Sequence, residues 1–308
     1  MSLVIRPIGA EAAADLHAIV MAAFEGRPPL DPPADALAET VETLGDALKE
    51  QGGLMAYHGD RPVGGLVLDD LGDLLALRRF GVAPDAQHHG VAHALIRESL
   101  AVAAEGGFDG LTVLARQELP RTVGFWVTSG FSERRREPPY VDLVRPLPRR
   151  HAAADADDMR ALGARLAGVL EAGDLLVLSG ELGAGKTTFT QGLGEGLQVR
   201  GDITSPTFVI ARVHPSLVGG PALVHADAYR LGGIEELDDL DLDTSLDDAV
   251  TVVEWGTGLA EGLADARLEV RITRAVGSEP VLDDETPGDD VRAVELVPVG
   301  ARWLGVPL

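Results

Sequence analysis

Apolar residues recur along this chain with two spacings, one typical of helices and one typical of strands. In the first half, apolar positions three or four residues apart, such as Leu16, Ile19 and Val20, predict helices. Short apolar runs on either side of a polar turn at residues 58–61 predict a β-hairpin. The expected helices span residues 10–24, 34–50, 91–104 and 121–129, and the expected strands span residues 4–7 (at a sheet edge), 54–57, 63–68, 74–82 and 111–114.

The second half combines the same two spacings. The apolar run at residues 175–178 predicts a buried parallel strand, and residues 187–193 open a helix after a glycine-rich turn. A helix is also expected near residues 157–170, with further strands at residues 207–213, 222–226, 249–253, 268–273 and 292–298. Residues 277–290 mix acidic side chains with Pro and Gly, so we expect a mobile loop there. Both halves predict an α/β fold, each with a sheet and flanking helices.

The length of 308 residues is sufficient for two domains, each with its own core. Prolines and arginines gather at residues 137–151, and we place the boundary there, which gives domains 1–149 and 150–308. No apolar run approaches the roughly 18 residues of a membrane span, and the first residues lack the features of a signal peptide. Cysteine is absent, which excludes disulfides and thiolate chemistry. We expect a cytoplasmic protein without a membrane partner.

Acidic side chains dominate the chain, whose net charge is −23. Their excess is larger in the second half, where residues 151–308 carry −17, than in residues 1–150, which carry −6. An acidic surface repels the phosphate backbone of nucleic acids. We therefore expect no DNA binding, and contact with RNA only through a partner protein.

The pattern G-x-x-x-x-G-K-[ST] of a phosphate-binding P-loop occupies residues 180–187. The chain has 26 Lys and Arg residues but only two lysines, Lys49 and Lys186, and the second stands in this pattern. A lysine ammonium inserts between β- and γ-phosphate oxygens as a compact point charge. The loop amides and the N-terminus of the following helix would face the same anion. The residues expected to bind ATP here are Glu181, Leu182, Gly183, Ala184, Gly185, Lys186, Thr187 and Thr188.

Two expected strands end in carboxylates, which makes these residues candidate metal ligands. Glu254 follows the apolar strand at 249–253, and Asp227 follows the strand at 222–226. Thr187 is the usual hydroxyl ligand of Mg²⁺ in a P-loop. The expected catalytic residues are Lys186, Asp227 and Glu254, and the expected Mg²⁺ ligands are Thr187, Asp227 and Glu254.

A Ser-Pro segment at residues 204–208 lies between the P-loop helix and the next strand. Such a segment can order over the γ-phosphate, as switch loops do, and Thr207 is the candidate contact. Taken alone, the same residues indicate only a turn. Tyr229 and Arg230, which follow Asp227, fit a role in the site and a role in surface packing equally well.

The motifs of the second half resemble, in content and order, those of the TsaE (YjeE) family of bacterial P-loop ATPases. The resemblance covers about residues 155–274 and rests on the P-loop, Ser205-Pro206-Thr207-Phe208, the segment 225–230 and Glu254-Trp255-Gly256. It implies an ATPase of tRNA threonylcarbamoyladenosine synthesis that works with TsaB-like and TsaD-like partner proteins. It also implies that Asp227, Glu254 and Trp255 handle nucleotide and metal. Thr257 departs from the family, whose members often carry Glu at that position.

A second anion-binding pattern, Q-x-x-G-x-A, lies between an expected strand and an expected helix of the first half. Its amides and the helix N-terminus can grip a pyrophosphate. With the strand at 111–114 and the segment 125–131, it resembles the GNAT N-acetyltransferases over about residues 3–146. The resemblance implies a splayed strand pair that holds acetyl-CoA. The residues of the pattern are Gln87, His88, His89, Gly90, Val91 and Ala92.

The proton donor of the first half departs from that family. Members often carry Tyr where this chain has Trp126, and an indole N–H is not an acid of that kind. Tyr140 is the nearest alternative donor in sequence, and no general base is evident. An active acetyltransferase and a degenerate GNAT domain therefore both remain open.

The sequence also leaves two other hypotheses for the function of the second half. A small-molecule P-loop kinase would usually need an arginine-rich lid, but arginines are sparse after Lys186 and residues 232–250 are acidic. A nucleotide-gated binding module would bind ATP with only incidental hydrolysis. Phosphate release, measured with and without partner proteins, separates these readings.

Overall fold

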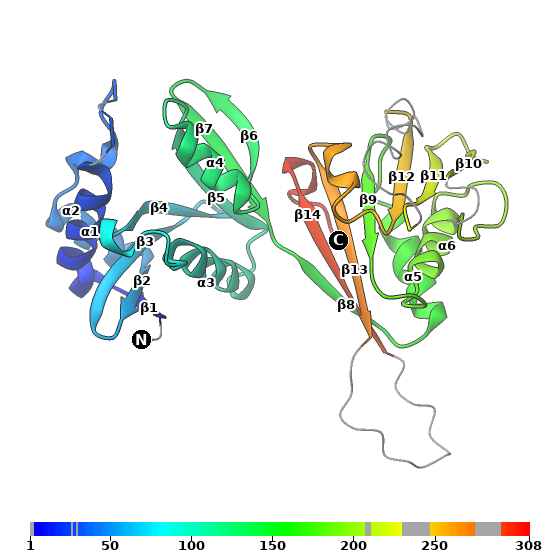
Figure 1. Ribbon diagram of the computed structural model, residues 1–308, viewed down its shortest axis with the longest axis horizontal. Coiled ribbons are helices and arrows are strands. Elements are labelled where there is room, and N and C mark those ends of the chain that lie inside the picture. The colour runs from blue at the N-terminus through cyan, green and yellow to red at the C-terminus, as the bar shows by residue number, and fades with distance from the viewer. Residues whose placement is uncertain (1–2, 26, 29, 207–210, 230–246, 275–290) are drawn as a thin grey trace, which may run out of the picture. The chain divides into compact units, whose positions relative to one another are not determined.

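The computed structural model describes residues 3–25, 27–28, 30–206, 211–229, 247–274 and 291–308. The chain separates into two compact units, Met1–Leu147 and Pro148–Leu308. Each unit contains a mixed sheet with helices against it, which confirms the expected α/β fold class (Figure 1). The expected loop at residues 277–290 lies outside the described residues. No helix in the described ranges is both long and apolar enough to span a membrane.

The first unit is built on a seven-stranded sheet in the order β1-β2-β3-β4-β5-β7-β6. All neighbouring strands are antiparallel except β4 and β5, which run parallel. The strands are β1 (Leu3–Ile8), β2 (Gly53–His58), β3 (Arg61–Asp70), β4 (Leu74–Val82), β5 (Gly110–Arg116), β6 (Ser132–Glu137) and β7 (Tyr140–Pro146). The helices are α1 (Ala13–Glu25), α2 (Val41–Gln51), α3 (Val91–Glu105) and α4 (Pro120–Thr128).

Helices cover both faces of this sheet (Figure 1). Side chains alternate between the faces of a strand, so neighbouring apolar residues join different cores. Met55 and Val67 pack with α1 and α2, whereas Leu54 and Leu66 pack with α3. The sheet therefore separates an α1–α2 side from an α3–α4 side.

Strands β4 and β5 pair over only three residues each and then part. The pairing joins Leu74, Leu75 and Ala76 to the first three residues of β5. Beyond it, Arg79 has a left-handed φ of 53°, and the register with β3 shifts at that point. One extra residue is thereby inserted into β4, as in a β-bulge. The second halves of β4 and β5 flank an opening in the sheet.

The second unit has a seven-stranded sheet in the order β10-β11-β12-β9-β13-β14-β8. Its central strands β11, β12, β9 and β13 are parallel, and the outer strands are antiparallel. The strands are β8 (Arg149–Ala153), β9 (Leu175–Ser179), β10 (Ala211–His214), β11 (Ala222–Asp227), β12 (Ala249–Glu254), β13 (Arg267–Arg274) and β14 (Arg292–Val299), and the helices are α5 (Ala156–Ala167) and α6 (Lys186–Gly196).

Helices α5 and α6 lie side by side against this sheet (Figure 1). Glycines permit their close approach, because a Cβ at Gly192 would collide with the carbonyl oxygen of Arg160, and one at Gly163 with that of Phe189. Phe189 and Leu193 of α6 pack with Leu176 and Leu178 of β9 in the main core. This packing fixes the start of α6 at the carboxyl end of the central strands.

Several elements differ from the sequence-based expectations. The expected helix at 34–50 is a 3₁₀ turn (Asp35–Ala38) followed by α2, because Thr40 caps α2 in a reciprocal contact with Thr43. Strands β6, β7 and β8 were not predicted. β8 pairs with β14 and spans the expected boundary at residue 150. Residues 207–210 of the expected strand 207–213 lie outside the described residues.

Candidate functional site

The P-loop connects the end of β9 to the start of α6, at the carboxyl edge of the parallel strands. Gly183 and Gly185 adopt left-handed φ values of 76° and 109°, which other residues reach only with strain. Gly185 is the N-cap of α6, so no side chain covers the first amides of the helix. Glu181, Leu182 and Ala184 complete the loop, and Thr188 lies on the first turn of α6. The loop therefore offers backbone amides and a helix N-terminus to an anion.

Lys186 is buried at the start of α6, with 5% of its surface exposed. Its Nζ donates to the carbonyl oxygens of Gly180, at 2.8 Å, and Glu181, at 3.1 Å. The same ammonium lies 3.7 Å from the ring centroid of Trp255. Burial lowers the pKa of Lys186, while the carboxylates of Glu254 and Asp227 partly oppose that shift. A phosphate bound at the loop would replace the two carbonyl oxygens as the hydrogen-bond acceptor of the Lys186 ammonium.

Thr187 and Glu254 contact each other across the gap between α6 and β12. The Thr187 hydroxyl lies 3.0 Å from Oε1 and 3.2 Å from Oε2 of Glu254. Glu254 is 2% exposed and ends β12, as the sequence predicts. The structure therefore brings together the hydroxyl and carboxylate that were expected to hold Mg²⁺.

His225 is a member of this site that the sequence analysis did not single out. It is fully buried on β11, and its Nε2 lies 2.9 Å from Oε1 of Glu254. Nδ1 of His225 has no hydrogen-bond partner. A hydrogen on Nε2, donated to Oε1, satisfies this contact and holds the Glu254 carboxylate in place. Strand alternation could have revealed it, since His225 is two residues from Asp227 and shares its face of β11.

Asp227 stands beside Glu254 at the ends of two paired strands. The register of β11 and β12 places the two residues directly opposite each other. Oδ2 of Asp227 accepts from the hydroxyl of Ser205 at 3.0 Å, and Oδ1 accepts from the amide of Tyr229 at 2.9 Å. The site thus joins β11, β12 and the Ser-Pro segment. Thr207 and Arg230 lie outside the described residues.

Trp255 follows Glu254 with a left-handed φ of 60°. Its amide donates to the carbonyl of Leu178 on β9, and its ring lies 5.1 Å from that of Tyr229. The indole thus sits between Lys186 and Tyr229. A pocket of about 620 Å³ opens beside it, lined by Ser179, Gly180, Glu181, Leu182, Trp255 and Thr257.

The donor set at this edge fits Mg²⁺. Mg²⁺ in phosphate-transfer sites keeps several waters and takes one or two carboxylates, a hydroxyl and phosphate oxygens. Thr187, Glu254 and Asp227 supply such groups. Within the ranges that the structure describes, no cluster of three or more His, Asp and Glu side chains could hold a metal ion alone.

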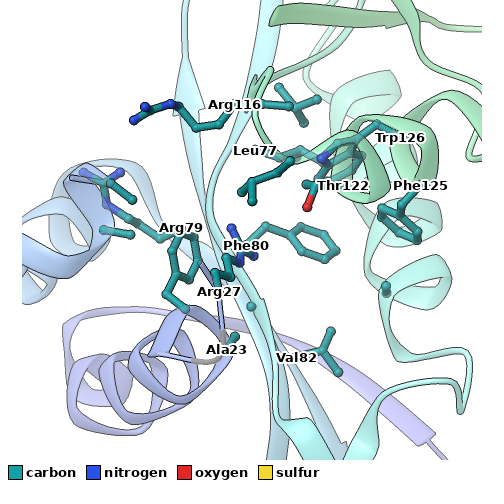
Figure 2. A pocket seen from close by; sticks show the side chains of 18 of the residues that line it. Ala23, Arg27, Leu77, Arg79, Phe80, Val82, Arg116, Thr122, Phe125 and Trp126 are labelled. Atoms are coloured by element: carbon teal, nitrogen blue, oxygen red, sulfur yellow. The ribbon is translucent and has the colours of Figure 1, made fainter. Parts of the chain in front are cut away.

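The first unit contains a larger pocket, of about 1160 Å³, at the opening between β4 and β5. It is lined from both sides of the sheet, by residues of α1 such as Ala23 and by residues of α4 such as Phe125 (Figure 2). The second halves of β4 and β5 form its walls. The pocket therefore passes through the sheet where the two strands part.

The Q-x-x-G-x-A pattern lies at the α3 end of this pocket. Gln87, His88, Gly90, Val91 and Ala92 line it, and Gly90 is the N-cap of α3 with a left-handed φ of 78°. His89 does not line it; its Nδ1 lies 2.7 Å from the carbonyl oxygen of Gln87.

The two candidate proton donors differ in their surroundings. Trp126 is buried among aromatic rings, with centroids of Phe80, Phe125 and Phe131 at 5.1–5.2 Å in edge-to-face contacts. Tyr140 lines the pocket, and the guanidinium carbon of Arg116 lies 5.5 Å from the centroid of the Tyr140 ring. Trp126 therefore belongs to the aromatic core as well as to the pocket lining, and Tyr140 is the phenol in that lining.

Two family models match this chain. The model described as "Threonylcarbamoyl adenosine biosynthesis protein TsaE" matches residues 153–279. The model of the "Acetyltransferase (GNAT) family" matches residues 14–131. The two matches fall in different units, and each unit contains one of the two pockets described above.

Known relatives resemble the second half. The Streptomyces coelicolor tRNA threonylcarbamoyladenosine biosynthesis protein TsaE is 63% identical over 146 residues, which are 47% of this chain and 93% of that protein. The Bacillus subtilis protein of the same description is 36% identical over 148 residues, 48% of this chain and 84% of that protein.

Solved structures resemble each half. Bacillus subtilis YdiB has 32% identity and a TM-score of 0.38, covering 51% of this chain and 88% of that one. A PaiA N-acetyltransferase from Thermoplasma acidophilum, crystallised with coenzyme A, has 15% identity and a TM-score of 0.43, covering 47% of this chain and 99% of that one.

Proposed function

Because this chain belongs to the TsaE family, we propose that residues 150–308 form an ATPase domain of the machinery that makes threonylcarbamoyladenosine in tRNA. One observation carries the ATPase part of the proposal. The P-loop lysine, the Thr187 hydroxyl and the Glu254 carboxylate converge at the carboxyl edge of four parallel strands. Phosphoryl transfer depends on positioning and charge stabilisation, and these groups supply both.

The chemistry assigns a role to each group. Lys186 exchanges its carbonyl partners for β- and γ-phosphate oxygens, and the P-loop amides bind the same phosphates. Thr187 would ligate Mg²⁺, which when bound neutralises charge on the phosphates, and Glu254 or Asp227 would ligate it directly or through water. The carboxylate that does not contact the metal orients the attacking water. The Trp255 ring borders the nucleotide and keeps Lys186 away from bulk water.

The proposal includes TsaB-like and TsaD-like partner proteins. The charge of −17 on residues 151–308 repels tRNA, so tRNA would contact the chain only indirectly, through these partners. A cytoplasmic location follows, because ATP and tRNA meet there.

Reconstitution tests this function. The assay combines the full chain with purified TsaB-like and TsaD-like proteins of the same organism, tRNA, ATP, Mg²⁺ and a threonine-derived donor of the threonylcarbamoyl group. Threonylcarbamoyladenosine is then measured by mass spectrometry of digested tRNA. We expect product to depend on this chain, on ATP and on Lys186. Equal product without the chain would refute the proposal.

We propose further that residues 1–149 form an acetyl-CoA-dependent N-acetyltransferase domain. The pocket that passes through the sheet supports it, because donor and acceptor can enter from opposite faces. Amides at residues 88–92 would bind the pyrophosphate, and the pantetheine would lie between β4 and β5. The acceptor amine attacks the thioester carbon, the C–N bond forms as the C–S bond breaks, and the leaving thiolate takes a proton from Tyr140. The acetylated amine would lose its proton to solvent, and the Tyr140 phenolate would regain one from solvent.

Calorimetric titration with acetyl-CoA tests this second activity, with release of free CoA thiol as the measure of turnover. Binding with turnover on amines is expected. Binding without turnover would leave a degenerate domain, and no binding at millimolar acetyl-CoA would remove the enzyme reading.

A further inference from the structure

Arginine is the main charged residue type in the lining of the through-sheet pocket. Five arginines line the pocket against one carboxylate, that of Asp35. This balance is the reverse of the first half as a whole, which is acidic. The cationic lining is therefore a local feature and does not follow from composition.

Three of these arginines already have carboxylate partners. Arg78 pairs with Asp69, Arg79 with Glu39 and Arg116 with Glu118. Arg116 also donates to the carbonyl oxygens of Asp31 and Pro32, at 3.1 and 2.7 Å. These guanidiniums are occupied in structural contacts and hold the walls of the pocket.

The other two lining arginines, Arg121 and Arg27, differ in their exposure, because Arg121 lies exposed on α4 whereas Arg27 is half-buried. Arg27 follows α1 and stacks on the ring of Phe24, with 3.7 Å between its guanidinium carbon and the ring centroid. Across the part of the chain that the structure describes, no carboxylate pairs with it. Burial lowers its pKa and nothing opposes that shift. A partly desolvated guanidinium without an anion is unfavourable, so this position favours an anionic ligand.

The position of Arg27 relative to the opening indicates which reactant would supply the anion. Figure 2 shows Arg27 beside Ala23 on one side of Phe80, with Phe125 and Trp126 on the other. The amides at residues 88–92, where the acetyl donor is expected, belong to the start of α3. Since α1 and α3 cover opposite faces of the sheet, Arg27 faces the entry left for the acceptor.

We propose that Arg27 binds an anionic group on the acceptor, so that the acceptor is an amine that also carries a carboxylate or a phosphate. The stacking on Phe24 fixes the plane of the guanidinium and leaves its edge for a bidentate contact with two anion oxygens. This inference rests on the acetyltransferase function proposed above. It adds a substrate class to that function.

Paired probes test it on the full chain. L-alanine is compared with L-alaninamide, and phosphoethanolamine with ethanolamine. The first pair reports on a carboxylate and the second on a phosphate. Affinity is measured by calorimetry with and without saturating CoA, and turnover by thiol release from acetyl-CoA. We expect at least one anionic probe to exceed its neutral partner by about tenfold to hundredfold, the range of a charge-assisted hydrogen bond.

Variants connect this preference to Arg27. Arg27→Met keeps the apolar stem and should abolish the preference, whereas Arg27→Lys keeps the charge and should retain part of it. Arg61→Met is the matched control, because Arg61 is exposed, pairs with Asp85 and lies outside the pocket. The inference is overturned if no anionic probe exceeds its neutral partner, or if Arg27→Met and Arg61→Met behave alike.

Failure of the acetyltransferase function gives a different result. Absent acetyl-CoA binding would contradict that function, while the probe titrations without CoA would still measure the anion site. A loss of acetyl-CoA affinity in Arg27→Met with an unchanged probe preference would assign Arg27 to the donor and overturn the inference.

Discussion

The Thr187 hydroxyl contacts both carboxylate oxygens of Glu254, at 3.0 and 3.2 Å. This contact joins the first turn of α6 to the end of β12, across the place where a nucleotide-bound metal is expected. It places two groups of different chemistry within the reach of one ion. Glu254 is therefore the residue on which metal-dependent hydrolysis should depend most strongly after Lys186.

Glu254→Gln should abolish Mg²⁺-dependent ATP hydrolysis while ATP still binds. The amide keeps the size of the side chain but loses the charge that holds the metal or orients water. We expect turnover to fall by about a hundredfold or more. Phosphate release measures turnover and calorimetry measures ATP binding. Glu195→Gln, an exposed change on α6, is the control, and equal turnover in the two variants would contradict the role of Glu254.

His225→Gln should lower turnover more than it changes KM for ATP. His225 contacts the Glu254 carboxylate rather than the nucleotide, so it acts as a positioning residue. Loss of such a contact typically costs about tenfold to a hundredfold in metal affinity or activity. Titration of turnover with Mg²⁺ should show a raised requirement for the metal. His214→Gln, on neighbouring β10 and also buried, should leave that requirement unchanged.

ATP binding should change the fluorescence of Trp255. Its ring contacts the Lys186 ammonium, which must move toward phosphate oxygens when nucleotide binds. The chain has three tryptophans, so single replacements separate their signals. Trp303→Phe should retain the ATP-dependent change and Trp255→Phe should lose it. A change that persists in Trp255→Phe would mean that the nucleotide does not reach this ring.

Tyr140→Phe should reduce acetyl transfer without reducing acetyl-CoA affinity. The change removes the phenolic proton but keeps the ring that borders the pocket. General acid catalysis contributes about a hundredfold or more, which sets the expected loss of turnover. Thiol release and calorimetry provide the two measurements. Tyr57→Phe on β2 is the control, and matching turnover in both variants would exclude Tyr140 as the acid.

Local sequence patterns predicted most helices and strands and the residues at the centre of the candidate nucleotide site. The P-loop, the strand ends at Asp227 and Glu254 and the turn before α3 depend on short-range sequence. Parallel strands bring their carboxyl ends to one edge, so the sequence could predict that Thr187, Asp227 and Glu254 would meet.

Features that depend on contacts between residues far apart in the sequence were not predicted. β6 reads Ser-Glu-Arg-Arg-Arg-Glu, without an apolar face, because it is an exposed edge strand whose side chains form ion pairs. β8 looks like a linker and becomes a strand only because β14 pairs with it. The unpaired charge of Arg27 likewise depends on which carboxylates the fold brings near, and no local pattern contains that information.

The most direct measurement is phosphate release by the full chain and by Lys186→Ala, with Mg·ATP and the TsaB-like and TsaD-like proteins present. Lys49→Ala is the matched control, because Lys49 is the other lysine and lies exposed on α2. We predict that the unaltered chain and Lys49→Ala release phosphate at the same rate. Lys186→Ala should release none above background and bind ATP about tenfold or more weakly, because the cation at the β- and γ-phosphates is lost. Unchanged phosphate release in Lys186→Ala would contradict ATP hydrolysis at this P-loop.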